Sequence, residues 1–79
     1  MLDKQIINFL SQQLGIKKEE VTLDSDFFSD LNVEKLQLAD LLLAAEQEFQ
    51  VTFPPKTLPK IQKVKDLLKI IKELNDELT

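Results

Sequence analysis

Apolar residues recur at every third or fourth position in three stretches of the chain, and this spacing restricts the chain to helices that each bury one side. The first stretch predicts a helix over about residues 3–14. Its buried side carries Leu2, Ile6, Phe9, Leu10 and Leu14. Gly15 follows the last apolar position and favours a left-handed cap, with Ile16 as the apolar contact of that cap.

The second stretch predicts a helix from Glu34 to about Phe49, expected to be the most buried helix of the chain. The buried face is expected to carry Leu36, Ala39, Leu42, Leu43 and Phe49, widened by Leu38, Leu41, Ala44 and Ala45. Asn32 suits the turn or cap before this helix, and Glu34 complements the positive end of the helix dipole. Pro54 and Pro55 end the helical region because proline cannot donate a backbone N–H.

The remaining segments complete an all-α fold. The connection over residues 17–32 is long and partly apolar, so we expect it to pack across the helices, with a turn of helix at Phe27 to Leu31. A short helix is expected near residues 57–61, with Thr57 as its cap and Pro59 in its first turn. A last amphipathic helix is marked by Val64, Leu67, Leu68, Ile71, Leu74 and Leu78. The pattern predicts a bundle of three long helices and one short helix, with a long structured loop between the first two long helices.

The composition excludes several classes of function. Cysteine and histidine are both absent, which removes disulfides, thiolate and imidazole catalysis and the usual zinc ligands. We expect residues 1–79 to form a single domain, too small for a cleft between two lobes and therefore not an enzyme. The net charge of -4 argues against nucleic-acid binding. The chain has no apolar run long enough to span a membrane and no signal-peptide pattern, so we expect a cytoplasmic protein. We also expect it to be a monomer.

Other candidate sites have simpler explanations. Asp26 and Asp30 could form an acid/base pair, but such loop carboxylates are commonly solvated or cap backbone N–H groups. The spacing of Asp24, Asp26 and Asp30 lacks the central glycine and final glutamate of a calcium loop, so we expect no metal site. The apolar stripes could line a lipid pocket, although stripes at helical spacing usually form core.

The centre of the chain resembles the acyl carrier protein family in the run Asp30-Leu31-Asn32-Val33-Glu34-Lys35-Leu36 and in the leucine-rich helix that follows it. The similarity extends to Gln13-Leu14-Gly15-Ile16, Glu19-Glu20-Val21, Glu46-Gln47-Glu48-Phe49 and Lys60-Ile61-x-x-Val64. The resemblance implies the family's helical bundle over nearly the whole chain.

The resemblance fails at the residue that carries the family's chemistry. Family members have Asp-Leu-Gly-x-Asp-Ser-Leu at this point, and the serine hydroxyl holds a phosphopantetheine arm. Here Asn32, Glu34 and Lys35 stand at the glycine, aspartate and serine positions. A lysine cannot form the phosphodiester, so we expect no phosphopantetheine and no other cofactor. Ser29, six residues before Lys35, is a weak alternative attachment site. Because the flanking residues differ as well, natural divergence explains the run better than a single engineered Ser→Lys replacement.

The resemblance also implies that an acidic second helix docks on basic partner proteins. Asp40, Glu46 and Glu48 retain part of that acidic face. Residues 54–65, however, contain four lysines and no acid, including Lys56 and Lys60. These lysines either redirect the choice of partner or only keep the surface soluble.

Two hypotheses about function follow. The first is a non-catalytic module that is not phosphopantetheinylated and acts by protein–protein interaction in a lipid or polyketide-type pathway. Its expected partner-binding residues are Glu34, Lys35, Asp40, Glu46, Glu48, Lys56 and Lys60. The alternative is a working acyl carrier for fatty-acid-type biosynthesis that uses an atypical attachment or binds an acyl chain non-covalently. In either reading acyl-chain-handling enzymes are possible partners.

Overall fold

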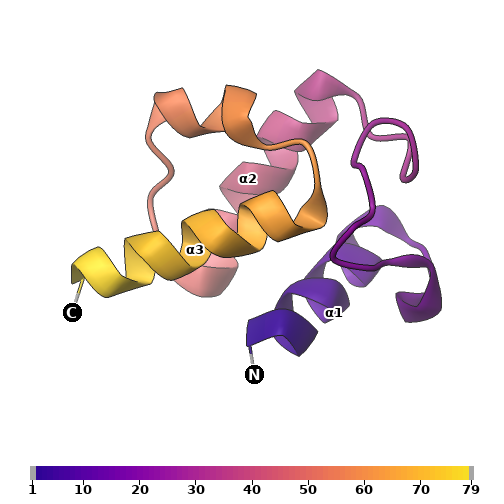
Figure 1. Cartoon of the computed structure of the whole chain (residues 1–79), viewed down its shortest axis with the longest axis horizontal. Coiled ribbons are helices and arrows are strands. Elements are labelled where there is room, and N and C mark those ends of the chain that lie inside the picture. Colours follow the sequence, from indigo (N-terminus) through magenta and orange to yellow (C-terminus); the bar gives the residue numbers. More distant parts are fainter. Residues whose placement is uncertain (1, 79) are drawn as a thin grey trace.

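The computed structural model describes residues 2–78, with side chains described as far as Asn75. The elements in chain order are α1 (Leu2–Leu14), the 3-10 helix η1 (Lys18–Glu20), α2 (Lys35–Phe49), the 3-10 helix η2 (Pro55–Lys60) and α3 (Val64–Leu78). Figure 1 shows α3 crossing in front of α2, with α1 on one side of the pair and η2 on the other. The predicted all-α bundle of three long helices and one short one is confirmed, and η1 is an additional short element.

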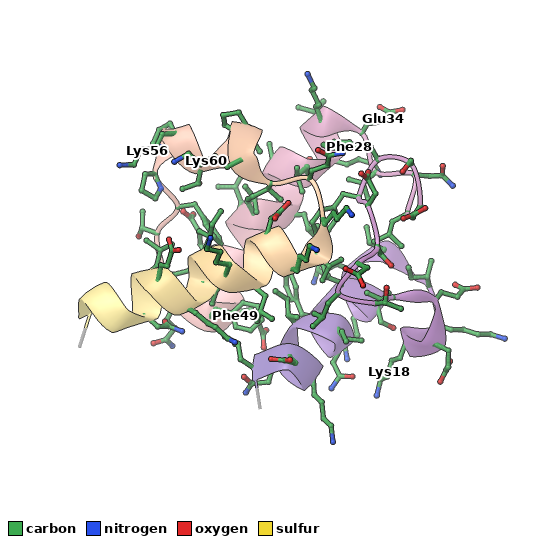
Figure 2. The ribbon with its side chains drawn as sticks, in the orientation of Figure 1. Lys18, Phe28, Glu34, Phe49, Lys56 and Lys60 are labelled. Atoms are coloured by element: carbon green, nitrogen blue, oxygen red, sulfur yellow. The ribbon has the colours of Figure 1, made fainter. Side chains whose placement is uncertain are left out.

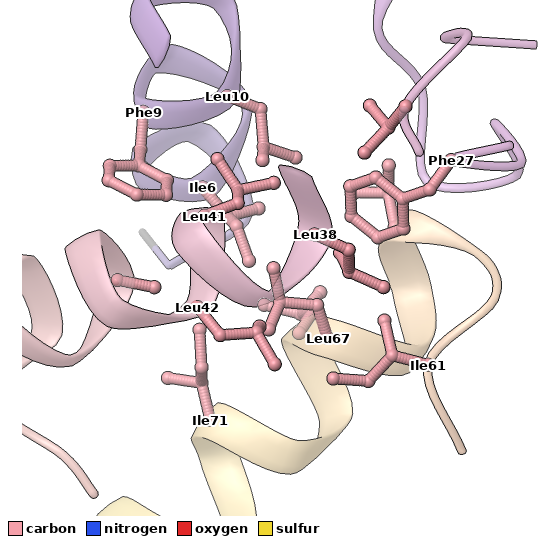
Figure 3. Close-up of a cluster of buried hydrophobic side chains, with 14 of the residues drawn as sticks. Ile6, Phe9, Leu10, Phe27, Leu38, Leu41, Leu42, Ile61, Leu67 and Ile71 are labelled. Carbon is pink, nitrogen blue, oxygen red and sulfur yellow. The ribbon is translucent and has the colours of Figure 1, made fainter. Parts of the chain in front are cut away.

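The core lies where the three long helices meet. Ile6 and Leu10 of α1 face Leu38 and Leu41 of α2, and Leu67 of α3 closes the cluster from below (Figure 3). Phe9 and Phe49 join α1 to the end of α2 through an edge-to-face contact, with ring centroids 5.5 Å apart. The core therefore depends on all three long helices. Leu78, expected on the apolar face of α3, lies outside the residues whose side chains are described.

The buried face of α2 differs from the predicted one. Its buried residues are Leu38, Leu41, Leu42 and Ala45. Leu36 is 76% exposed and Leu43 62% exposed, although both were expected in the core. The helix has leucines on nearly every side, so helical spacing alone allowed two faces. α2 is also not more buried than α3, which buries Val64, Leu67, Leu68 and Ile71.

The loop between η1 and α2 packs across the bundle, as expected, through the fully buried Phe27. The turn predicted at Phe27 to Leu31 forms as a single turn. The Asp30 N–H donates to the carbonyl of Asp26 at 3.0 Å, which is the i→i+4 bond of a helical turn, and the Leu31 N–H donates to the same carbonyl at 3.0 Å. The Asp26 side chain caps this turn by accepting the N–H groups of Phe28 and Ser29, which have no partner within the turn.

Two helices end in a left-handed residue. Gly15 has φ +67°, and the N–H of Ile16 donates to the carbonyl of Ser11 at 3.1 Å, as the glycine and the isoleucine after it predicted. α2 ends in the same way at Gln50, with φ +54°. Thr57 is not the cap expected for the short helix: η2 begins after Pro54, and the Thr57 hydroxyl donates to the Pro54 carbonyl at 2.7 Å.

Replacing Gln50 by glycine is expected to stabilise the protein by about 1 kcal/mol, because a side chain is disfavoured at positive φ and glycine is not. The matched control is Gly15→Ala. A Cβ atom at Gly15 would meet nothing within 4 Å, so backbone strain alone should destabilise that variant by about 1 kcal/mol. Urea unfolding followed by circular dichroism measures both changes, and equal signs for the two variants would contradict the explanation.

Candidate functional site

The start of α2 carries the residues that the sequence singled out. α2 begins at Lys35, one residue later than predicted, and Glu34 is its extended N-cap residue. The Glu34 N–H donates to Gln37 Oε1 at 2.9 Å. Asn32, in the turn before the helix, has φ +56°, a conformation that asparagine adopts more readily than most residues. Lys35 is therefore the first helical residue, and it is exposed.

A second group of contacts fixes the loop that approaches this helix end. Asp26 Oδ1 accepts the N–H groups of Phe28 and Ser29, at 2.8 and 3.0 Å. Its other oxygen, Oδ2, accepts from Gln62 Nε2 at 2.9 Å, and the Phe27 N–H donates to the Gln62 carbonyl at 2.9 Å. These bonds tie the loop to the segment just before α3, which sets Phe28 and Gln62 beside α2.

Phe28 and Gln62 are two walls of a hollow of about 330 Å³ at the start of α2. Its other walls are Lys35, Leu38, Leu58, Pro59 and Ile61. The lining is mainly apolar, and Lys35 is its only charged residue. The volume lies at the lower end of the roughly 300–1,000 Å³ typical of small-molecule pockets.

A second hollow of about 200 Å³ lies further along α2 and shares Leu58 with the first. α2 contributes Ala39, Leu42, Leu43 and Glu46, and the other wall comes from residues 53–58. We call the two hollows together the α2–η2 groove, because each is bounded by α2 on one side and by η2 on the other. Leu43 is exposed at the edge of the second hollow, and Leu36, seven residues earlier, is exposed on the same outer side of α2.

The groove collects some of the predicted partner-binding residues and not others. Lys35 and Glu46 line it, and Lys56 and Lys60 project from η2 (Figure 2). Asp40 is exposed on the outer face of α2. Ala39 lines the groove, and Glu48 follows it by nine residues, which is two and a half turns of an α-helix. Glu48 therefore lies on the side of α2 that faces away from the groove.

Glu46 and Ser29 have local structural contacts. Glu46 Oε2 accepts the N–H of Phe53 at 2.8 Å and so closes the turn after α2. Ser29 is exposed in the Asp26 turn, where its N–H is already bonded to Asp26. Glu34, labelled near Phe28 in Figure 2, precedes Lys35 at the start of α2 and does not line either hollow. The acidic residues are thus dispersed around α2.

Leu36 and Leu43 are the exposed residues that sequence reasoning missed, because leucines at helical spacing were assigned to the core. A usable signal was present. Leu38, Leu41, Leu42 and Ala45 form an equally good face, and only one of two faces can be buried. Among the side chains that the structure describes, residues 2–75, no three acidic groups gather as a metal site would require. No helix of the described residues is long and apolar enough to cross a membrane.

The pKa of Asp26 is lowered, first by the N–H of Ser29, then by Gln62 and by the N–H of Phe28, because these donors favour the charged carboxylate. A lowered pKa in the folded state means that the carboxylate stabilises the fold above about pH 4 and that this contribution is lost as the pH falls through the lowered pKa. We expect Asp26→Asn to be less stable than wild type at neutral pH and to converge with it in acid.

Urea unfolding at a series of pH values tests this expectation. Asp24→Asn is the matched control, because Asp24 is exposed and its carboxylate only meets Lys65 Nζ at 3.3 Å, a contact of little weight at the surface. Parallel stability curves for wild type and Asp26→Asn over the whole acid range would show that Asp26 does not act through its charge.

Comparison with known proteins defines the class to which this fold and site belong. Residues 4–71 match the family model described as "Phosphopantetheine attachment site". The chain is 38% identical over 68 residues to an acyl carrier protein of Coprothermobacter proteolyticus, covering 86% of this chain and 83% of the relative. It is 30% identical over 77 residues to the acyl carrier protein of Clostridium acetobutylicum, covering 98% and 100%.

A solved structure agrees with these relatives. The acyl carrier protein of Thermotoga maritima superposes with a TM-score of 0.80 at 26% identity, covering 96% of this chain and 88% of the other. The chain belongs to the acyl carrier protein family. Members of this family are carriers that interact with acyl-handling enzymes, and they are not catalysts themselves.

Proposed function

We propose that this protein is a member of the acyl carrier protein family that carries no phosphopantetheine and acts by binding other proteins in a lipid or polyketide-type pathway. The observation that carries the proposal is Lys35 at the first position of α2. Residues 30–36 contain neither serine nor threonine, so the start of α2 offers no hydroxyl for a phosphodiester.

The serines elsewhere are poor substitutes. Ser11 donates its hydroxyl to the carbonyl of Ile16 at 2.6 Å, and Ser25 is buried, with its oxygen 3.0 Å from the N–H of Thr22. Ser29 is exposed but belongs to the turn that Asp26 organises. A transferase that attaches phosphopantetheine at the start of α2 would have to reach six residues upstream, into different backbone geometry.

Intact-protein mass tests the proposal. The wild-type protein is incubated with coenzyme A and a broad-specificity phosphopantetheinyl transferase, beside a serine-containing acyl carrier protein as positive control. We expect an unchanged mass for the wild type. A gain of one phosphopantetheine arm would overturn the proposal, and repetition with Ser29→Ala would decide whether Ser29 is the site.

The protein-binding part of the proposal rests on exposed charge around α2 and η2. Asp40 and Glu48 are exposed, so their charges can be reversed without breaking a contact of the fold. Reversing the charge of Glu46 would also disturb the fold, because its carboxylate accepts the Phe53 N–H and closes the turn there. We expect an Asp40→Lys/Glu48→Lys variant to lose partners that wild type captures from cell extract. The matched control is Asp3→Lys/Glu19→Lys, which makes the same charge change on α1 and η1. Identical partners for wild type and both variants would count against an acidic docking face.

A second candidate is a carrier that holds an acyl chain non-covalently. It is favoured by one observation, the apolar hollow of about 330 Å³ beside Lys35. Extraction of the purified protein into organic solvent, followed by mass spectrometry, tests this candidate. Recovery of stoichiometric lipid that is lost in Leu58→Gln would support it, and an extract without lipid would exclude it.

A further inference from the structure

We propose that the α2–η2 groove binds an acidic, amphipathic segment of a partner protein, with the segment's apolar side over Leu36, Leu43 and Leu58 and its carboxylates opposite Lys35, Lys56 and Lys60. This inference rests on the proposed function in that it names the chemistry of the partner. It is tested by a different measurement, however, because peptide binding in the groove depends neither on the presence nor on the absence of phosphopantetheine.

The first support is apolar area that the fold leaves uncovered. Leu36 and Leu43 are 76% and 62% exposed, and Leu58, which borders both hollows, is 36% exposed. A single exposed leucine is ordinary, but Leu43 and Leu58 line the second hollow together, and Leu36 lies two turns before Leu43 on the same side of α2. Helical spacing aligns Leu36 with Leu43 along one side of α2, which suits a partner with its own apolar stripe.

The second support is charge, which selects an acidic partner. η2 supplies Lys56 and Lys60, and residues 54–65 contain no acid. Lys35 adds a third ammonium group on the opposite wall. The one carboxylate that lines the groove, Glu46, is held by the N–H of Phe53 at 2.8 Å. Asp40 lies on the outer face of α2 with Leu36 and Leu43, Glu48 lies on the far side of the helix, and neither lines the groove, so the η2 side of the groove is basic.

The charge also orients the segment. Lys35 and η2 meet at the first hollow, whereas Glu46 borders only the second. The partner's carboxylates are therefore expected over the first hollow and along η2, and its uncharged end over the second hollow. A basic partner would place its charges against three lysines and would be disfavoured on this side of α2.

A pair of synthetic peptides tests the proposal on the full chain. One is an amphipathic helix of leucines and glutamates, and its twin replaces each glutamate by lysine. Amide chemical shifts of the labelled protein report the site and the affinity. We expect the glutamate peptide to bind with a dissociation constant no weaker than about 1 mM, to shift α2 and η2 amides, and to weaken as salt is added.

Two sets of variants separate the groove from general electrostatics. Lys35→Glu/Lys56→Glu/Lys60→Glu should weaken the glutamate peptide by about tenfold, since each exposed pair contributes about 1.4- to 5-fold. Lys4→Glu/Lys17→Glu/Lys18→Glu makes the same change of net charge on α1 and η1, remote from the groove (Figure 2 labels Lys18), and should weaken it much less. Leu36→Gln/Leu43→Gln should also weaken binding without unfolding the protein, because both side chains are exposed.

Four outcomes would overturn the proposal: no shift at any peptide concentration, equal binding of the two peptides, shifts that map to α1 or α3, or equal losses in the two lysine variants. Shifts of the same α2 and η2 amides on raising the protein concentration without peptide would assign the groove to a second copy of this chain instead. A failed peptide test leaves the mass measurement on Lys35 intact, so the two proposals fail separately.

Discussion

Lys35→Ser is expected to gain one phosphopantetheine arm when it is incubated with coenzyme A and a broad-specificity transferase, whereas wild type gains none. The reason is local. Position 35 is exposed and opens α2, so a serine there would present its hydroxyl at the positive end of a helix, where a phosphate is favoured. Intact-protein mass after the reaction gives an all-or-none answer.

The flanking residues decide how strong this test is. Asn32 already has the left-handed backbone that a glycine would take at the same position, so Asn32→Gly should disturb little. A second variant, Asn32→Gly/Glu34→Asp/Lys35→Ser, therefore restores the whole run that the transferase meets in the family. The matched control is Lys35→Ser/Ser29→Ala, which should be modified to the same extent as Lys35→Ser. If the full replacement stays unmodified while a serine-containing family member reacts, the loss of the serine is not what blocks attachment.

Phe27→Ala is expected to destabilise the protein by about 3 to 5 kcal/mol, the usual range for removing a fully buried aromatic ring. This is a large part of the roughly 5–15 kcal/mol that holds a small domain folded. Phe27 is 0% exposed and fixes the long loop to the core, while its own N–H bonds to the Gln62 carbonyl. Its loss should loosen both the loop and the wall of the first hollow.

Phe28→Ala is the matched control, since it removes the same ring from the next position, where the side chain is only half-buried and lines the first hollow. We expect it to cost about 1 kcal/mol. Urea unfolding of both variants gives the comparison. Equal costs for the two variants would mean that the loop is not anchored through Phe27.

Helical spacing predicted the number, order and approximate ends of the long helices, because an amphipathic helix is specified by residues close together in the sequence. The cap at Gly15 was predictable for the same reason, since a glycine after the last apolar position is a local signal. The single turn at Phe27 to Leu31 was also predictable, whereas the capping of its free N–H groups by the Asp26 side chain was seen only in the structure.

The candidate site was likewise predictable only in part. The sequence by itself determined that residues 30–36 hold no hydroxyl, that a helix begins within one residue of Lys35, and that lysines gather in residues 54–65 without an acid. Composition and local spacing are enough for each of these.

Only the tertiary structure decided which side of α2 is buried. Leucines surround that helix, and the choice of Leu38, Leu41 and Leu42 over Leu36 and Leu43 depends on where α1 and α3 pack. That packing leaves two leucines exposed, brings η2 alongside to complete the groove, and separates Glu48 from the lysines. Contacts between elements distant in the sequence set these positions, and no spacing within a single helix contains that information.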